Sequence, residues 1–168
     1  MKTSPTPVVS DSDVLIHLSN LRRIDLLQIL FSSVSIPEFV KAEISEKEDQ
    51  EINKALATLL IVHPTSTKKA KQIADRHGIH IGEAHVKALG ESLKAKLFLS
   101  NERKVRKAAL EEGFQVVGTI GIILRAAHIR AIAKSEALSL LEQMKSEDFR
   151  IHHDLIREAI NTLHKKTF

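Results

Sequence analysis

Four acidic residues occupy positions from which their carboxylates could act together. Asp11 follows a short apolar stretch, Glu43 lies one and a half turns into a predicted helix, Glu83 lies in the first turn of another, and Glu102 follows the apolar residues 97–99. Carboxylates that converge on one cleft repel one another, so such clusters are tolerated chiefly where a hard cation such as Mg²⁺ or Mn²⁺ neutralises them. A site of this kind can activate water and stabilise the charge that develops in phosphodiester hydrolysis. Each acid alone is equally explained as a helix cap or first-turn residue.

The elements that must position these acids alternate along the chain. Brief apolar runs predict strands at residues 7–10, 34–36, 59–62, 97–99 and 115–117. Helical periodicity and capping residues predict helices at 12–18, 21–31, 37–44, 50–58, 68–77, 82–93, 102–111, 119–133, 135–144 and 154–164. Short strands that are apolar on both faces predict a three-layer α/β/α sandwich, with helices on both sides of a parallel sheet of four to five strands.

Three capping predictions bear on the acids. Ser12 or Asp13 is expected to cap the first helix, Asn101 the helix at 102–111, and Gly78 is expected to end the helix at 68–77. In open parallel sheets ligands bind beyond the carboxyl ends of the strands. Asp11 and Asn101 each follow such an end, which makes this edge of the sheet the predicted site.

Composition limits the functions to consider. The 168 residues contain 25 Lys and Arg against 21 Asp and Glu, a net charge of +4, and no Cys, Trp or Tyr. Without Cys there is no disulfide, thiolate zinc site or cysteine nucleophile, and a reducing compartment, the cytoplasm, is expected. No apolar run is long enough to cross a bilayer. Without Trp and Tyr the chain lacks platforms for stacking unpaired bases.

The charges are unevenly distributed along what we predict to be one domain over 1–168. Residues 1–60 carry 6 basic and 9 acidic side chains, and residues 61–168 carry 19 and 12. This division is compatible with one surface for cations and another for phosphates, or with random clustering on a solvated surface. The sequence has no Gly-rich phosphate loop, nucleophile elbow or dinucleotide-binding fingerprint.

The order of the motifs resembles that of a PIN domain. The stretches VVSDSDVLI (8–16), LLQILF (26–31) and SIPEFVKAEI (35–44) look like its opening. Three later stretches resemble the rest of a PIN domain: GEAH (82–85), LFLSNERKVRKAA (97–109) and VGTIGIIL (117–124). The resemblance covers a core of about residues 7–130, and the helices predicted at about 131–168 also suit prokaryotic PIN-like proteins related to VapC toxins.

What the resemblance implies is a metal-dependent endoribonuclease, often the toxin half of a type II toxin–antitoxin pair, with acids holding Mg²⁺ or Mn²⁺. Asp11, Glu43 and Glu83 match the first three acidic positions of the family. At the fourth, Asn101 stands where relatives have a metal-binding Asp, and Glu102 follows it. An amide oxygen can still bind Mg²⁺ but removes one negative charge.

Two functions therefore remain open at this stage. In the first, Asp11, Glu43, Glu83 and Asn101 bind the metal, and Glu102 completes the site or positions water. In the second, the missing charge leaves a weakened or inactive PIN-like module that binds nucleic acid or protein. RNA cleavage with Mn²⁺ separates the two.

The densest basic cluster follows the fourth position. It consists of Arg103, Lys104, Arg106 and Lys107, and residues 101–130 hold 6 basic against 3 acidic side chains. Beside a metal site these cations would hold RNA phosphates without reading bases. The alternatives are ion pairs that brace the acids, or an ordinary exposed helix.

Histidines and late apolar residues complete the predictions. His77, His80 and His85 surround Glu83, but Gly78 interrupts their spacing, so we interpret them as surface residues rather than zinc ligands. Apolar residues on the last two helices are expected to pack in the core, to form a homodimer, or to receive an antitoxin segment. They are Leu138, Leu140, Leu141, Ile156, Ile160 and Leu163.

Overall fold

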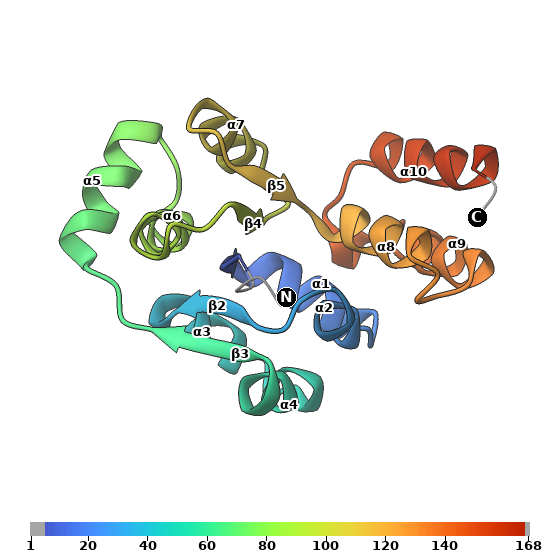
Figure 1. Ribbon diagram of the computed structural model, residues 1–168, viewed down its shortest axis with the longest axis horizontal. Helices are drawn as coiled ribbons and strands as arrows, with labels where there is room; N and C mark the ends of the chain where they lie inside the picture. Colours follow the sequence, from blue (N-terminus) through green and yellow to red (C-terminus); the bar gives the residue numbers. More distant parts are fainter. Residues whose placement is uncertain (1–5, 167–168) are drawn as a thin grey trace, which may run out of the picture.

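A five-stranded parallel sheet forms the centre of the computed structural model, which describes residues 6–166 (Figure 1). The strands are β1 (Val8–Ser10), β2 (Val34–Pro37), β3 (Leu60–His63), β4 (Leu97–Leu99) and β5 (Gln115–Val117). Their order is β3-β2-β1-β4-β5, and every neighbouring pair is parallel. The predicted α/β fold with a parallel sheet is confirmed.

Helices cover both faces of this sheet. They are α1 (Ser12–Asn20), α2 (Asp25–Leu30), α3 (Glu38–Ser45), α4 (Gln50–Thr58), α5 (Thr67–His77), α6 (Ile81–Leu93), α7 (Arg103–Glu111), α8 (Thr119–His128), α9 (Lys134–Gln143) and α10 (His153–Lys165), with a 3₁₀ helix η1 (Glu147–Phe149). Figure 1 shows α5 and α6 on one side of the sheet and α1, α2 and α8 on the other. Within residues 6–166, no helix has the length and apolar character needed to span a membrane.

The strand order has a switch point between β1 and β4. From β1 the chain continues to β2 on one side, whereas from β4 it continues to β5 on the other. Because the two connections leave in opposite directions, their loops separate at the carboxyl ends of these two strands, and ligands of open parallel sheets bind at such a point. The residues after β1 and β4 are Asp11 and Ser100-Asn101, so the topology places them at the position where this fold class binds ligands.

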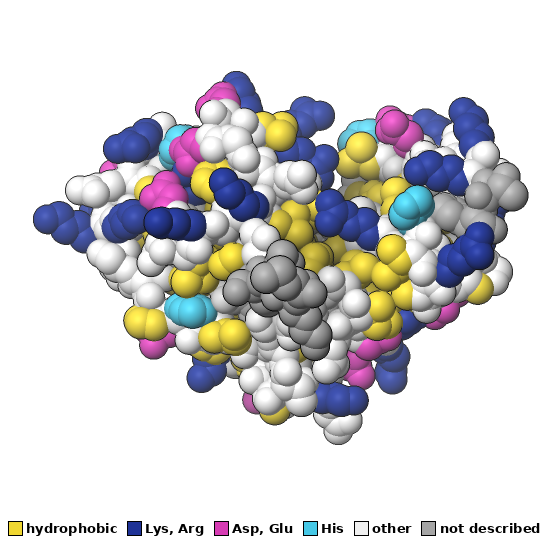
Figure 2. Space-filling view, in the orientation of Figure 1, with side chains coloured by type: hydrophobic (Ala, Val, Ile, Leu, Met, Phe, Trp, Pro, Cys, Tyr) yellow, Lys and Arg dark blue, Asp and Glu magenta, His cyan; other side chains and the backbone are white. Residues whose placement is uncertain are grey.

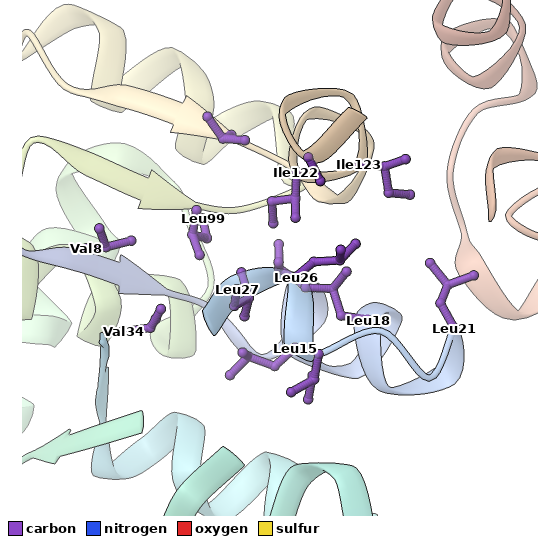
Figure 3. Close-up of a cluster of buried hydrophobic side chains, with 14 of the residues drawn as sticks. Val8, Leu15, Leu18, Leu21, Leu26, Leu27, Val34, Leu99, Ile122 and Ile123 are labelled. Carbon is purple, nitrogen blue, oxygen red and sulfur yellow. The ribbon is translucent and has the colours of Figure 1, made fainter. Parts of the chain in front are cut away.

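The core fills the space between the sheet and one helical layer. Side chains of α1, α2 and α8 meet those of β1, β2 and β4 (Figure 3). Leu15, Leu18, Leu27, Ile122 and Ile123 are completely buried there, and each contributes roughly 1.5–3 kcal/mol by leaving water. Residues that are far apart in the sequence thereby hold the start of α1 and the start of α8 together.

The late apolar residues extend this core. Leu140, Leu141, Ile156 and Leu163 are buried, and Leu138 and Ile160 are partly buried against them. Helix α9 packs between α8 and α10. Core packing therefore accounts for most of the surface of these residues, and the homodimer and the antitoxin partner stay predictions.

Two predicted helices are shorter than expected. The helix predicted at 21–31 begins only at Asp25, and the one predicted at 119–133 ends at His128. In both places a residue with positive φ turns the chain, Arg22 at 55° and Arg130 at 60°. The apolar period continues across both turns because the segments on either side face the same core, so periodicity could not locate the breaks.

Buried charge fixes α7 beside α6. The Lys87 side chain is only 4% exposed, and its Nζ lies 2.5 Å from Oε2 of Glu112 and 3.1 Å from Oε1 of Glu91. A second contact comes from Lys104 of α7, whose Nζ donates to the carbonyl oxygen of Gly78, in the loop before α6, at 3.3 Å. Buried ion pairs of this kind specify geometry more than they add stability. Here they hold the helices that carry Glu83 and Glu102 in one arrangement.

Candidate metal centre

Asp11 links the end of β1 to the start of α1. Its backbone N–H donates to the carbonyl oxygen of Leu99 at 3.0 Å, and its Oδ1 accepts from the backbone N–H of Val14 at 3.1 Å. Asp11 is therefore the helix cap, and the predicted caps Ser12 and Asp13 were wrong. One residue separates the end of β1 from the start of α1, and that residue, Asp11, takes the capping position.

Burial makes the ionised form of the Asp11 side chain unfavourable. The residue is 7% exposed. Its burial raises its pKa from 3.8 to about 7, a shift to which the charges of Asp13 and Glu102 add, while hydrogen bonds from Ser100 and from the Val14 N–H oppose it. A carboxyl group held in this way gains most from a nearby cation, which would favour its charged form.

Glu83 belongs to the same cluster of acids. Helix α6 starts at Ile81, one residue earlier than predicted, with His80 as its cap. Oε2 of Glu83 accepts from the His80 N–H at 2.9 Å, and Nδ1 of His80 accepts from the Gly82 N–H at 3.1 Å, a reciprocal capping box. Partial burial raises the pKa of Glu83, the His80 hydrogen bond lowers it, and the charge of Glu102 raises it.

Four carboxylates thus share one electrostatic environment. Asp13 and Glu102 act on both Asp11 and Glu83. From the sequence, Asp13 was a candidate cap and also, with Glu102, a possible substitute for the acid missing at position 101; its position one turn after the end of β1 agrees with the second role. We call Asp11, Asp13, Glu83 and Glu102 the acidic cluster.

Glu43 comes from α3, a helix that contributes no member of the acidic cluster. It is partly exposed on α3, a helix that contacts both α1 and α6. Its predicted role as a metal ligand stays a prediction.

The chemistry of the donors fits a hard divalent cation. Carboxylate oxygens are the ligands that Mg²⁺ and Mn²⁺ prefer. Across residues 6–166, no three carboxylate or imidazole groups stand close enough together to hold a metal ion without moving. The exposed side chains of Asp13 and Glu102 are free to reorient, whereas Asp11 is fixed by its capping bond.

Asn101 makes a different set of contacts. Its Oδ1 accepts from the Thr119 N–H at 2.9 Å, and its Nδ2 lies 3.0 Å from both Oγ1 of Thr119 and Nδ1 of His17. A Cβ atom at Gly118 would lie 2.5 Å from that Oδ1, so a residue without a side chain is needed there. The prediction that Asn101 caps α7 was wrong, because Glu102 holds the cap position and the amide is turned toward α8.

His17 completes this network. It is 5% exposed, and burial lowers its pKa, which favours the neutral ring with a lone pair to accept from Asn101. The ring also makes an edge-on contact with Phe149, with centroids 5.4 Å apart. Sequence reasoning missed His17 and Thr119; the only signal was that each lies shortly after a strand that ends at this edge of the sheet.

The basic cluster lies on α7, next to the acidic cluster. Arg103, Lys104, Arg106 and Lys107 are all exposed, and dark-blue side chains are visible around α7 in Figure 2. None of the four forms an ion pair with a residue in the part of the chain that the structure describes. The alternative in which Arg103 or Arg106 braces the acids by ion pairing is therefore not seen.

The three histidines near Glu83 have three different environments. His80 is exposed and caps α6, and His77 is partly buried with its Nε2 3.5 Å from Oε1 of Glu112. The expectation of a surface position was wrong for His85, which is 5% exposed, stacks on Phe39 and lies 2.5 Å from Oγ1 of Thr65. The His85 ring is packed in the interior, where its contact with Phe39 joins α6 to α3.

Comparison with known proteins supplies the remaining information. The family model described as "DUF3368: PIN domain" matches residues 7–165. Among solved structures, the crystal structure of PAE2754 from Pyrobaculum aerophilum aligns with a TM-score of 0.57 at 13% identity, covering 73% of this chain and 98% of that chain. This likeness concerns the fold alone. A comparison with curated proteins gave no significant match.

Proposed function

The chain belongs to the PIN domain family, and from this premise we propose that it is a metal-dependent endoribonuclease that hydrolyses phosphodiester bonds in RNA. PIN domains are typically nucleases and usually bind Mg²⁺ or Mn²⁺. The family match includes the C-terminal helices, which sequence reasoning had placed outside the core of the resemblance. The observation that carries the proposal is the acidic cluster at the switch point, with a buried Asp11 whose pKa is raised to about 7.

Each part of the site has a role in this proposal. Asp11 and Glu83 would hold the cation, joined by Glu102 and Asp13, with Glu43 as a further predicted ligand from α3. A bound Mg²⁺ or Mn²⁺ would supply Lewis acidity toward water and the phosphodiester. The exposed cations of α7 would hold the phosphates on either side of the bond to be cleaved, since guanidinium and ammonium groups bind backbone charge without reading bases.

Asn101 is better explained as a positioning residue. Its amide hydrogen bonds fix the start of α8 against α1, beside Asp11. The carbonyl oxygen keeps a second lone pair, so its predicted contact with the metal stays open as a prediction. A toxin role, with an antitoxin as partner, rests on the family resemblance.

The test is cleavage of a labelled single-stranded RNA with added Mn²⁺. We expect wild type to cleave and Asp11→Asn to lose activity by at least a hundredfold. Glu102→Gln should lose activity, whereas Glu111→Gln, an exposed acid on the same helix, should not. EDTA should abolish all cleavage, and robust cleavage by Asp11→Asn would contradict the proposal.

One alternative function has an observation in its favour. The amide at position 101 leaves the family's fourth acidic position uncharged, which favours a weakened PIN-like module that binds nucleic acid or protein without cleaving. If wild type binds the same RNA but fails to cleave it under all metal conditions, and Asn101→Asp cleaves it, this alternative is correct.

A further inference from the structure

A second candidate binding site lies in the C-terminal part of the molecule. A cavity of about 600 Å³, open to the surface, lies between the end of α8, the turn that follows it, the start of α9 and the end of α10. Its lining residues are Ala127, Arg130, Ile132, Ala133, Lys134, His164 and Lys166. Because α8 begins beside Asn101 and its ten residues span about 15 Å, the cavity is separated from the acidic cluster by the length of a helix.

The polar part of the lining is entirely basic. Arg130, Lys134, His164 and Lys166 come from three different segments, and no carboxylate is among the described residues that line the cavity. None of these four residues forms an ion pair within residues 6–166. Among the described residues, the Lys134 ammonium donates to a neutral partner, the carbonyl oxygen of Lys166 at 3.3 Å, which joins the start of α9 to the end of α10.

Like charges gathered without counter-charges repel one another, so this arrangement is stabilised when an anion binds. Dark-blue and cyan side chains gather over this helical part of the surface in Figure 2. The acidic cluster presents the same situation with the opposite sign. The two sites therefore call for ligands of opposite charge.

The size and the remaining lining narrow the class of anion. A volume of about 600 Å³ is within the usual range of small-molecule sites and is far more than one inorganic ion fills. Ala127, Ile132 and Ala133 supply an apolar wall beside the cations. A ligand with a phosphate at one end and a flat, weakly polar group at the other would match both parts of the lining.

We propose that this cavity binds the phosphate and base of a nucleotide, with Arg130 and Lys134 as the principal phosphate contacts. The nucleotide comes either free or as part of an RNA strand. The site needs no divalent metal and does not depend on whether the acidic cluster cleaves RNA.

Calorimetric titration of the full chain in EDTA tests the proposal. The probes are adenosine 5′-monophosphate, adenosine without phosphate, a ten-nucleotide single-stranded RNA, and a ten-residue polyglutamate peptide. We expect the monophosphate or the RNA to bind at least tenfold more tightly than adenosine and polyglutamate. Tighter binding of the monophosphate identifies a free nucleotide as the ligand. Tighter binding of the RNA identifies a strand when Arg130→Gly weakens it, because the cations of α7 are also expected to bind RNA phosphates.

The structure offers a matched pair of variants. Arg130 and Lys94 both have positive φ, 60° and 53°, where glycine is favoured, so Arg130→Gly and Lys94→Gly each remove one cation without straining the backbone. Lys94 does not line the cavity. Arg130→Gly should weaken binding at least tenfold and Lys94→Gly less than twofold, with both variants folded by circular dichroism.

A second variant covers the other principal contact. Lys134→Gln keeps the stem that packs at the cavity wall and should also weaken binding by about tenfold. Equal binding of adenosine and its monophosphate, a preference for polyglutamate, or unchanged binding by both Arg130→Gly and Lys134→Gln would each overturn the proposal. Loss of RNA cleavage with intact nucleotide binding would instead contradict only the nuclease function.

Discussion

The ends of β1 and β4 lie side by side in the sheet, but the polar side chains that follow them have opposite environments. At the end of β1, Asp11 is buried, and two neighbouring carboxylates oppose its ionisation. At the end of β4, Asn101 has both ends of its amide occupied by Thr119 and His17. Position at a sheet edge is therefore not enough to identify a ligand: a buried group with unmet charge is available to a cation, whereas an amide that is hydrogen-bonded at both ends also serves the scaffold.

The largest expected effect tests the β1 side. In EDTA at pH 8, Asp11→Asn should raise the free energy of unfolding by up to about 4 kcal/mol, because ionising Asp11 in the folded protein is disfavoured by the shift from 3.8 to about 7. Asparagine still caps α1. The variant should also lose the increase in melting temperature that Mn²⁺ gives wild type.

The pH dependence follows from the sign of that shift. Because the pKa of Asp11 is raised in the folded state, its protonated form favours folding at low pH, and this contribution is lost as pH rises from about 4 to 7. The stability difference between Asp11→Asn and wild type should therefore shrink toward pH 4 in urea denaturation. A variant no more stable than wild type at pH 8 would contradict this account.

The next effect tests the β4 side. Asn101→Asp restores the acid typical of the family, yet at pH 8 it should destabilise the protein by about 1–3 kcal/mol, because it removes the Nδ2 donor shared by Thr119 and His17 and places a partly buried charge there. Thermal unfolding at pH 8 measures the loss. A stable Asn101→Asp protein at this pH would show that the amide network is dispensable.

His17 gives the same variant a distinctive pH profile. In wild type, burial lowers the pKa of His17, so its contribution makes the protein less stable as pH falls below 6.5. In Asn101→Asp the new carboxylate should raise that pKa, and the stabilising contribution is then present below pH 6.5 and lost above it. The destabilisation should therefore be smaller at pH 6 than at pH 8.

A smaller effect tests the packing of the amide. Gly118→Ala should cost about 1–2 kcal/mol, because the added Cβ would lie 2.5 Å from Oδ1 of Asn101 and must displace it. The same substitution in an Asn101→Ala background is the control, because the atom that the new Cβ meets is then absent. Urea denaturation should show a clearly larger loss for Gly118→Ala in the wild-type background, and equal losses in the two backgrounds would mean that Asn101 moves freely.

The smallest effect on stability is expected for the exposed arginines of α7, whose removal tests whether α7 binds RNA. The double variant Arg103→Gln with Arg106→Gln should change the free energy of unfolding by less than about 0.5 kcal/mol, since both side chains are exposed. It should weaken RNA binding about tenfold and reduce its salt dependence. The matched double variant Lys71→Gln with Arg76→Gln on α5 should bind normally in filter-binding assays.

Much of the fold could be predicted because its signals are local. Apolar runs located all five strands within a residue or two, and Gly78 ends α5 with a φ of 60°, as expected. The breaks at Arg22 and Arg130 were missed because charged residues hold left-handed positions where glycine would have signalled a turn. Local sequence thus gives elements reliably and their ends only where the expected residue type is present.

Some features of the candidate site could likewise be predicted from the sequence, and others could not. From the sequence alone came the types and order of the acids, the family resemblance, the missing charge at Asn101 and the basic residues of α7. Only the tertiary structure decided that Asp13 joins Asp11 and Glu83, that His17 and Thr119 occupy the Asn101 amide, and that four basic residues from three segments line one cavity. The physical reason is that chemical identity belongs to a residue, whereas burial, pKa and hydrogen bonding depend on neighbours that can lie far along the chain, such as Thr119, which is 102 positions from His17.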